Sequence, residues 1–500
     1  MLAEPDRASF VREYEAGRPQ VVWTSLVADL ETPVSALLKL ADGRPWSFLL
    51  ESVEGGAIRG RYSIIGLKPD LVWRCRGERA EINRRARIDR EAFVPEPLPA
   101  LASLRALIRE SRIPMPPGLP PPAAGLFGYM AYDMVRLMER LPAIAPDPLG
   151  LPDAIFVRPT IVAVFDNLAD QVTLVTPVWP TEGLSAARAW DLAQERLFEA
   201  VEDFDRGIRH EPPRRDVVPV EPQPMMSREA FEAMVRRCKE YIAAGDAFQI
   251  VISQRFTVPF SLPPLALYRA LRRLNPSPFL FFLDFGAFAL VGSSPEILVR
   301  LRDGKVTIRP LAGTRRRGAT REEDEALAAE MLADPKERAE HLMLLDLGRN
   351  DVGRVAQVGT VRVTEKMVVE RYSHVMHISS NVEGLLRPDL EALDALVAGF
   401  PAGTVSGAPK VRAMEIIEEL EPVRRSFYAG TIGYFAADGS MDTCIGLRTA
   451  LVKDGAMIVQ AGAGIVHDSD PAAEYQETLN KARALVRAAE EAVRFATRGR

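Results

Sequence analysis

Apolar residues recur along this chain with two periods, which separate expected helices from expected strands. Residues 231–242 repeat apolar side chains every three or four positions. Ser227 precedes this segment as an N-cap and Gly245 follows it, so we predict an amphipathic helix between them. A second helix is expected from Leu184 to about Phe204.

Short runs rich in β-branched and aromatic residues predict strands in both halves. In the first half they cover residues 155–165 and 171–178. In the second half they begin near Ala247 with FQIVISQRFTV, FLFFLDF and FALVG, and return in AGTIGYF, CIGLRTALV and AMIVQAGAG. With helices between and after them, these runs predict an α+β or α/β protein.

Proline-rich stretches divide the chain. They occupy residues 114–122 and 211–224, and proline neither continues a helix nor donates to a strand ladder. A chain of 500 residues also exceeds what one core usually supports. We therefore predict an N-terminal region at 1–210, a linker at 211–226 and a second region at 227–490.

Composition excludes several classes of partner. The chain is 47% hydrophobic and 26% charged, with a formal net charge of -5, so neither a nucleic-acid nor a membrane partner is expected. Its three cysteines are widely separated and lack zinc-like spacing. The start MLAEPDRASF does not resemble a secretory signal, and the most apolar window, 278–292, is too short to span a bilayer. A cytoplasmic location is expected.

Two pairs of glutamates share one spacing. Glu337 and Glu340 lie three residues apart, as do Glu474 and Glu477, and on a helix this spacing puts both carboxylates on one face. Either pair alone is typical of a solvated helix with ordinary ion pairs. Because two such helices facing each other offer the few carboxylates that magnesium takes, the repeated spacing favours a magnesium site.

Glycines and arginines supply candidate anion contacts. AGAGIV at 461–466 follows an apolar run, and RPLAGTRRRG at 309–318 combines Gly313 and Thr314 with four arginines. Backbone N–H groups beside glycine can approach an anion closely. For the first segment a plain turn is the simpler reading, and for the second a solvated basic loop. The Rossmann fingerprint GxGxxG is excluded, because His467 stands where its last glycine would be.

Histidine is scarce, with five in the chain. His377 lies in YSHVMHISSNVEG, a strand-like run beside polar groups. A lone histidine is more often structural than catalytic, but its ordinary pKa suits proton transfer near neutrality.

Taken in order, these segments resemble one family, the chorismate-utilising enzymes, and within it the large subunits of anthranilate synthases. The matching segments include GDAFQIV, GSSPE, RPLAGTR, LADPKERAEHLMLLDLGRND, FPAGTVSGAPKVRAMEII and QAGAGIVHDSDPAAEYQETLNKA. The first half matches through FLLES, RYSIIG and GLFGYMAYD. The resemblance implies an α+β sandwich of large mixed antiparallel sheets with helices outside.

This resemblance also implies a site. Glu337, Glu340, Glu474 and Glu477 would surround Mg2+, which holds a carboxylate of chorismate. Arg448 would bind a carboxylate through two parallel hydrogen bonds, which lysine cannot copy. The implied substrate contacts are Gly313, Thr314, Tyr428, Arg448, Gly462, Ala463 and Gly464.

The implied reaction adds ammonia at ring carbon 2 of chorismate while the carbon 4 hydroxyl leaves. The resulting aminodeoxyisochorismate then loses pyruvate to become aromatic. Glu296 in GSSPE is the expected acid, and burial near other carboxylates would raise its pKa in part. His377 and Thr404 are expected near the reacting ring.

Two positions distinguish the sister enzymes. Water-adding isochorismate and salicylate synthases have lysine where this chain has Gln249, which favours ammonia as the nucleophile here. Aminodeoxychorismate synthases typically have a nucleophilic lysine where this chain has Ala312. Arg316 departs from the family's usual proline, which we expect to affect only the loop. The alternatives are 2-amino-2-deoxyisochorismate synthase, aminodeoxychorismate synthase, and a tryptophan-sensing pseudoenzyme.

Partners follow from the same resemblance. None of the three cysteines lies in a Gly-x-Cys-x-Gly context, so ammonia from glutamine would require a separate glutamine amidotransferase subunit, in a heterotetramer. Tryptophan is expected as a feedback inhibitor. The residues expected at its pocket are Glu51, Ser52, Pro278, Phe279 and Leu280.

Overall fold

The computed structural model describes residues 3–54, 58–142, 145–208, 221–372 and 375–498. Its helices are α1 (Arg7–Glu15), α2 (Pro33–Ala41), α3 (Ala100–Glu110), α4 (Ala186–Asp205), α5 (Arg228–Ala243), α6 (Pro264–Leu274), α7 (Arg321–Ala333), α8 (Pro335–Gly353), α9 (Ala392–Gly399), α10 (Lys410–Leu420) and α11 (Pro471–Arg498), with 3-10 turns η1 (Pro121–Ala123), η2 (Tyr132–Leu137) and η3 (Gly403–Val405).

Its strands in the first half are β1 (Gln20–Val27), β2 (Ser47–Glu54), β3 (Ile58–Arg76), β4 (Arg79–Asn83), β5 (Val94–Pro95), β6 (Gly125–Met130), β7 (Ala154–Asp166) and β8 (Gln171–Val178). The remaining strands are β9 (Gln223–Pro224), β10 (Gln249–Pro259), β11 (Phe279–Asp284), β12 (Ala289–Ser294), β13 (Ile297–Arg302), β14 (Lys305–Ile308), β15 (Leu311–Arg316), β16 (Arg362–Arg371), β17 (Val375–Leu385), β18 (Gly407–Ala408), β19 (Thr431–Ala436), β20 (Met441–Ile445), β21 (Thr449–Lys453) and β22 (Ala456–Ile465).

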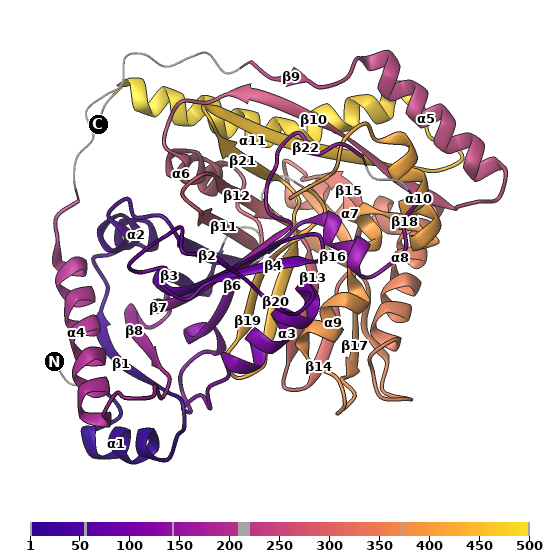
Figure 1. Cartoon of the computed structure of the whole chain (residues 1–500). Helices are drawn as coiled ribbons and strands as arrows, with labels where there is room; N and C mark the ends of the chain where they lie inside the picture. Colours follow the sequence, from indigo (N-terminus) through magenta and orange to yellow (C-terminus); the bar gives the residue numbers. More distant parts are fainter. Residues whose placement is uncertain (1–2, 55–57, 143–144, 209–220, 373–374, 499–500) are drawn as a thin grey trace.

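The strand pairings between these elements are antiparallel throughout. Helices flank the strands, with α4 and α11 on the outside of the molecule (Figure 1). The expected α+β architecture of large antiparallel sheets with outer helices is confirmed.

Strands from the two halves of the chain pair with each other. β2 pairs with β11, which sets Ser52 opposite Phe279, and β6 pairs with β19. The early and late strands therefore lie side by side in the middle of the molecule (Figure 1). Residues 209–220, most of the predicted linker, lie outside the described residues, and the division into regions stays a prediction.

Both predicted helices form where the apolar period placed them. α5 begins after Ser227, whose hydroxyl accepts a hydrogen bond from the backbone N–H of Ala230. It ends just before Gly245, which adopts φ +85°. α4 runs from Ala186 to Asp205, and its apolar face packs against β8 and α1. β7 and β8 match the runs predicted at 155–165 and 171–178.

Two glycine-containing segments differ from expectation. The turn expected at AGAGIV is wrong, because Gly462 and Gly464 lie inside β22, opposite Ser253 and Val251 of β10. The solvated loop considered for RPLAGTRRRG is also wrong, because it forms β15. The register of β15 against β17 shifts between Ala312 and Arg315. Long-range strand pairing decides both cases, and periodicity does not reveal it.

Packing brings two helix starts to one side of the sheets. α8 lies against β15 and β17, while α11 runs along β22 and packs on α5 and α6 (Figure 1). The thiols of Cys75, Cys238 and Cys444 are free and buried. Within the described ranges, none of the helices combines the length and apolar character needed to cross a membrane.

Candidate active site

The paired glutamates of α8 and α11 converge. Asp334 caps α8 by accepting a hydrogen bond from the backbone N–H of Glu337 at 3.4 Å, so Glu337 and Glu340 occupy the first two turns. Burial, and after it the negative charges of Glu337 and Glu477, raise the pKa of Glu340. Since such repulsion falls off with distance, the starts of the two helices face each other.

Two cations accompany these carboxylates. Burial and the charge of Glu477 raise the pKa of Glu474. Lys481 lies one turn beyond Glu477, and its Nζ is 2.6 Å from Glu477 Oε1. Arg315 bonds Oε1 of Glu337 at 2.7 Å. The cluster therefore combines acidic groups from both helices with a cation against each.

The carboxylates of this cluster are of the ligand type that magnesium takes. Among the described residues, no group of three or more histidine, cysteine, aspartate or glutamate side chains is arranged so that it could hold a metal ion. Magnesium is usually held by one or two carboxylates and keeps water or substrate oxygens in its other positions. Burial is the main cause of the raised pKa values of Glu340 and Glu474, and neighbouring carboxylates add to it; a bound divalent cation would offset part of this cost. Carboxylate oxygen is the type of ligand that magnesium prefers.

Glu296 lies between β12 and β13 and is only 6% exposed. Thr404 Oγ1 donates toward both of its carboxylate oxygens, at 3.1 and 3.2 Å. The backbone N–H of Leu311 approaches Oε1 at 3.4 Å. Burial raises the pKa of Glu296 to about 8, although these hydrogen bonds and the charge of Arg448 oppose the rise. Glu296 is therefore an acid that keeps its proton near neutrality.

His377 on β17 is held through one ring nitrogen. Its Nδ1 lies 2.8 Å from the carbonyl oxygen of Gly313 and 3.2 Å from Thr314 Oγ1. Burial and the positive charge of Arg448 lower the pKa of His377 to about 4. A neutral ring that donates from Nδ1 leaves Nε2 with a free lone pair, and Nε2 is buried without a partner among the described residues.

Arg448 lies between β20 and β21 with φ 47°, a conformation that non-glycine residues adopt rarely. The residue keeps some exposure, but burial of its guanidinium lowers its pKa. The nearby acid, Glu296, keeps its proton near neutrality. Within the described ranges Arg448 therefore has no ionised acid as a partner, and its positive charge is suited to a carboxylate ligand.

The glycines of β22 leave space beside two polar side chains. A Cβ added to Gly462 would come within 2.6 Å of Tyr428 Oη, and one added to Gly464 within 2.8 Å of Gln249 Nε2. Gln249 donates from Nε2 to Glu340 at 3.1 Å. The small strand residues thus bring Tyr428 and Gln249 against the backbone, next to the acidic cluster.

Lys481 and Arg315 were not among the predicted site residues. Lys481 also donates to the carbonyl oxygen of Gly462 at 2.9 Å, so it joins β22 to α11. The spacing of four residues after Glu477 was a usable signal, because residues one turn apart share a helix face. Arg315 carried no comparable signal, since its partner is 22 positions away in sequence.

The residues expected at a tryptophan pocket meet at the β2–β11 edge. Ser52 pairs with Phe279 and Glu51 with Leu280. The Glu51 carboxylate is buried and accepts hydrogen bonds from Arg272 at 2.5 and 2.7 Å and from Tyr268 at 2.5 Å. Pro278 directly precedes β11. Arg272 and Tyr268 of α6 were not predicted.

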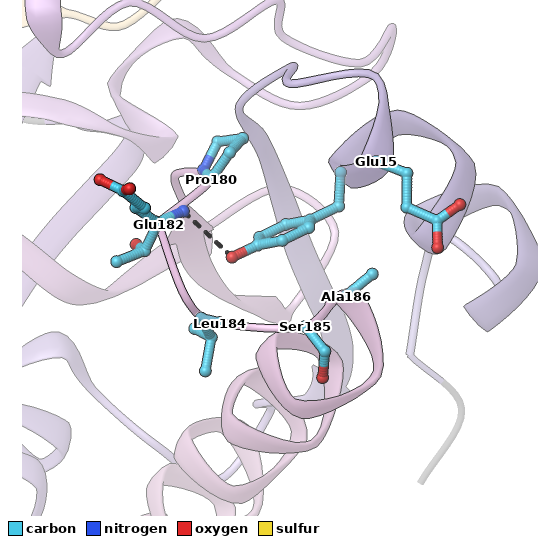
Figure 2. Close-up of a pocket in the computed structure, with 8 residues that line it drawn as sticks. Glu15, Pro180, Glu182, Leu184, Ser185 and Ala186 are labelled. Carbon is cyan, nitrogen blue, oxygen red and sulfur yellow. Dashed lines mark hydrogen bonds between the residues drawn. The ribbon is translucent and has the colours of Figure 1, made fainter.

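A cavity at the start of α4 contains none of the predicted site residues. Figure 2 shows Pro180, Leu184 and Ser185 around it, and Tyr14 accepts a hydrogen bond from the backbone N–H of Thr181 at 3.1 Å. A second cavity lies near Trp46.

The chain is similar to known proteins over most of its length. Residues 68–487 match the chorismate binding enzyme family. Anthranilate synthase component 1 of Cereibacter sphaeroides is 61% identical over 494 residues, covering 98% of both chains. That of Thermus thermophilus is 50% identical over 475 residues, covering 93% of this chain and 97% of the relative.

Solved structures share the fold of this chain. The crystal structure of anthranilate synthase component I from Streptococcus pneumoniae aligns with a TM-score of 0.75 and 36% identity, covering 92% of this chain and 98% of that one. The menaquinone-specific isochorismate synthase from Escherichia coli aligns with a TM-score of 0.71 and 21% identity over 97% and 98% of the two chains, a likeness that shows the fold alone. The chain belongs to the chorismate binding enzyme family and, within it, to the anthranilate synthase component 1 family.

Proposed function

We propose that this chain converts chorismate and ammonia to anthranilate, pyruvate and water, as the large subunit of an anthranilate synthase. The observation that carries the proposal is one site that combines a protonated acid, Glu296, a neutral base, His377, and a cation free for a carboxylate, Arg448. The reaction needs each of these three groups.

Two groups of residues would bind the two carboxylates of chorismate. Glu337, Glu340, Glu474 and Glu477 would hold magnesium, which supplies positive charge for one carboxylate of chorismate. Arg448 binds the other carboxylate through two parallel hydrogen bonds. The absence of side chains at Gly462 and Gly464 lets Tyr428 and Gln249 lie against β22, where they would contact the bound substrate.

In the first step Glu296 donates its proton to the carbon 4 hydroxyl, which leaves as water. The ammonia nitrogen forms its bond at ring carbon 2 as the carbon 4–oxygen bond breaks, and one ammonia proton is released. Burial supports this role, because a carboxyl group with a pKa of about 8 is protonated at neutral pH.

In the second step His377 Nε2 takes the proton from ring carbon 2. The carbon 3–oxygen bond breaks, the ring becomes aromatic, and the enolpyruvyl group leaves and gains a proton to become pyruvate. The hydrogen bond from Nδ1 to Gly313 supports this assignment, since it orients the lone pair of Nε2 away from β15.

Ammonia is favoured over water or a covalent nucleophile by two residues. The side chain of Gln249 donates to Glu340 and has no basic lone pair with which to activate water. Ala312 offers no amine to attack the ring. A glutamine amidotransferase subunit is proposed as the ammonia source in a heterotetramer, and the free buried thiols support a reducing cytoplasm.

The test is to incubate the purified chain with chorismate, magnesium and excess ammonium salts at about pH 8, close to the raised pKa of Glu296, and to follow anthranilate fluorescence and pyruvate. Glu340→Ala should remove turnover, whereas Glu325→Ala, at an exposed position of α7, should not. Consumption of chorismate without pyruvate would instead identify a 2-amino-2-deoxyisochorismate synthase or an aminodeoxychorismate synthase, which the position of the amino group on the product distinguishes. Tryptophan binding without any consumption would identify a sensor.

Tryptophan inhibition is proposed at the β2–β11 edge. The pairing of Ser52 with Phe279, and of Glu51 with Leu280, supports a shared pocket there. Replacing Ser52 with a larger residue should weaken inhibition without changing turnover in the absence of tryptophan. Unchanged inhibition would exclude this location.

A further inference from the structure

A cavity of about 550 Å³ lies in the N-terminal half and contains none of the candidate active-site residues. Its walls come from residues 44–46 before β2, from Lys68 and Pro69 of β3, from the segment 86–90 after β4, and from residues 199–206 at the end of α4. Four segments distant in sequence thus meet around one space.

The cavity has a surplus of positive charge. Five of the residues that line it are lysine or arginine and three are acidic, in a protein whose net charge is -5. Glu199 and Asp203 each lie 3.4 Å from Lys68, and Asp203 also pairs with Arg206. Two of the acids therefore already serve two of the cations.

The remaining cations of the cavity are Arg44, Arg87 and Arg90. Within the described ranges, none of these three guanidinium groups makes a hydrogen bond, an ion pair or a contact with an aromatic ring. Guanidinium is a planar donor that matches the oxygens of carboxylates and phosphates. All three arginines are exposed, so an anion can reach their guanidinium groups from solvent.

A further arginine, Arg196, interacts electrostatically with Arg87 of the cavity. It lies on α4, and burial, followed by the charge of Arg87, lowers its pKa to about 10, although the charges of Asp70 and Glu199 oppose the shift. Lys68 and Trp46 also adopt left-handed backbone conformations, with φ 49° and 61°, of the kind found at binding sites.

The cavity also has apolar lining residues. Trp46, Pro45 and Pro69 line it, and the indole of Trp46 lies edge-on to Phe285 at 5.9 Å between ring centroids. We propose that this cavity binds a small organic oxyanion, a carboxylate or a phosphate ester with a flat apolar part, which Arg44, Arg87 and Arg90 hold while Trp46 covers its apolar side.

The test is isothermal titration calorimetry of the full chain at low ionic strength, with phenyl phosphate and phthalate as separate probes and inorganic phosphate as a third. The expected result is saturable binding that is about tenfold weaker in the double variant Arg87→Gln with Arg90→Gln, because charge-assisted hydrogen bonds are lost. Comparing the aryl probes tells phosphate from carboxylate, and inorganic phosphate isolates the contribution of the apolar part.

Three controls make the result specific. Arg79→Gln removes an exposed arginine elsewhere in the same half and should leave binding unchanged. Glu202→Gln removes a negative charge from the cavity wall and should tighten binding. Trp46→Phe should remove the change in tryptophan fluorescence that accompanies binding. Turnover of chorismate should be unchanged in the double variant.

Three outcomes would overturn the proposal. The first is a titration of the wild-type chain that does not saturate below about 10 mM, which is weaker than any specific site requires. The second is equal affinity in the double variant. The third is an equal loss in Arg79→Gln, which would mean that the anions respond only to overall charge.

Discussion

Thr404 donates one hydroxyl hydrogen toward both carboxylate oxygens of Glu296, at 3.1 and 3.2 Å. Burial raises the pKa of Glu296 to about 8, and this hydrogen bond opposes the rise because it favours the charged carboxylate. The two residues together therefore determine the pH at which the proposed acid loses its proton.

Replacing Thr404 by valine should move the alkaline limb of the pH–rate profile to higher pH. Activity that needs protonated Glu296 falls as pH rises through about 8, and losing the hydroxyl raises this pKa further. Glu296→Gln should lower kcat by about 10²–10⁴. Thr257→Val, at an exposed position of β10, is the matched control. An alkaline limb that stays in place in Thr404→Val would contradict the assignment.

Magnesium affinity should weaken as pH falls. The pKa values of Glu340 and Glu474 are both raised, and carboxylates must be deprotonated to bind a metal, so protons compete with it on acidification. Calorimetric titration with magnesium at a series of pH values measures the effect. Glu474→Gln should reduce both the affinity and its slope with pH, whereas Glu325→Gln should change neither. An affinity independent of pH would count against these ligands.

His377 should contribute no inflection near pH 6.5 to the activity profile. Its pKa is lowered to about 4, so the ring stays neutral at every pH above that value at which the fold persists. His377→Gln should slow release of pyruvate by about 10²–10⁴, measured separately from the consumption of chorismate. An inflection near 6.5 that vanishes in this variant would show that the histidine titrates normally.

Acid should destabilise the fold through a second histidine. His341 is fully buried against Ser380 at 2.6 Å, and burial lowers its pKa from 6.5 to about 4. Between these values the unfolded state binds more protons, so the free energy of unfolding falls as pH drops from 6.5 to 4. Urea denaturation at several pH values measures this slope. His341→Gln should make it shallower, with the remainder from His377, and an unchanged slope would refute the prediction.

Removing only one member of the buried ion pair of Glu51 and Arg272 should lower the free energy of unfolding. Arg272→Met leaves the carboxylate without its cation and should lower the free energy of unfolding by about 3–5 kcal/mol, whereas Glu51→Gln alone is the other single variant of the cycle. The double variant Glu51→Gln with Arg272→Met should lose less, because no charge stays buried alone. Urea denaturation of the four proteins in this cycle tests the coupling. Additive losses would mean that the pair does not interact.

Local pattern was enough for much of the fold. The helix behind Ser227, the helix ending near Phe204 and the runs at 155–165 and 171–178 were all predictable, because caps and apolar periods act within a few residues. The same locality placed Glu337 beside Glu340 and Glu474 beside Glu477. Local pattern failed at Gly462, where pairing with β10 extends a strand through an apparent turn.

Sequence alone thus determined which residues share a helix face or a strand, and the order of motifs that marks the family. Tertiary structure decided the rest: that the carboxylates of α8 and α11 face each other, that Glu296 is buried enough to hold its proton, and that arginines from distant segments meet near Trp46. The reason is the distance in sequence over which each effect acts. Spacing along a chain sets neighbours within a turn, whereas burial and charge at a site depend on segments hundreds of residues apart.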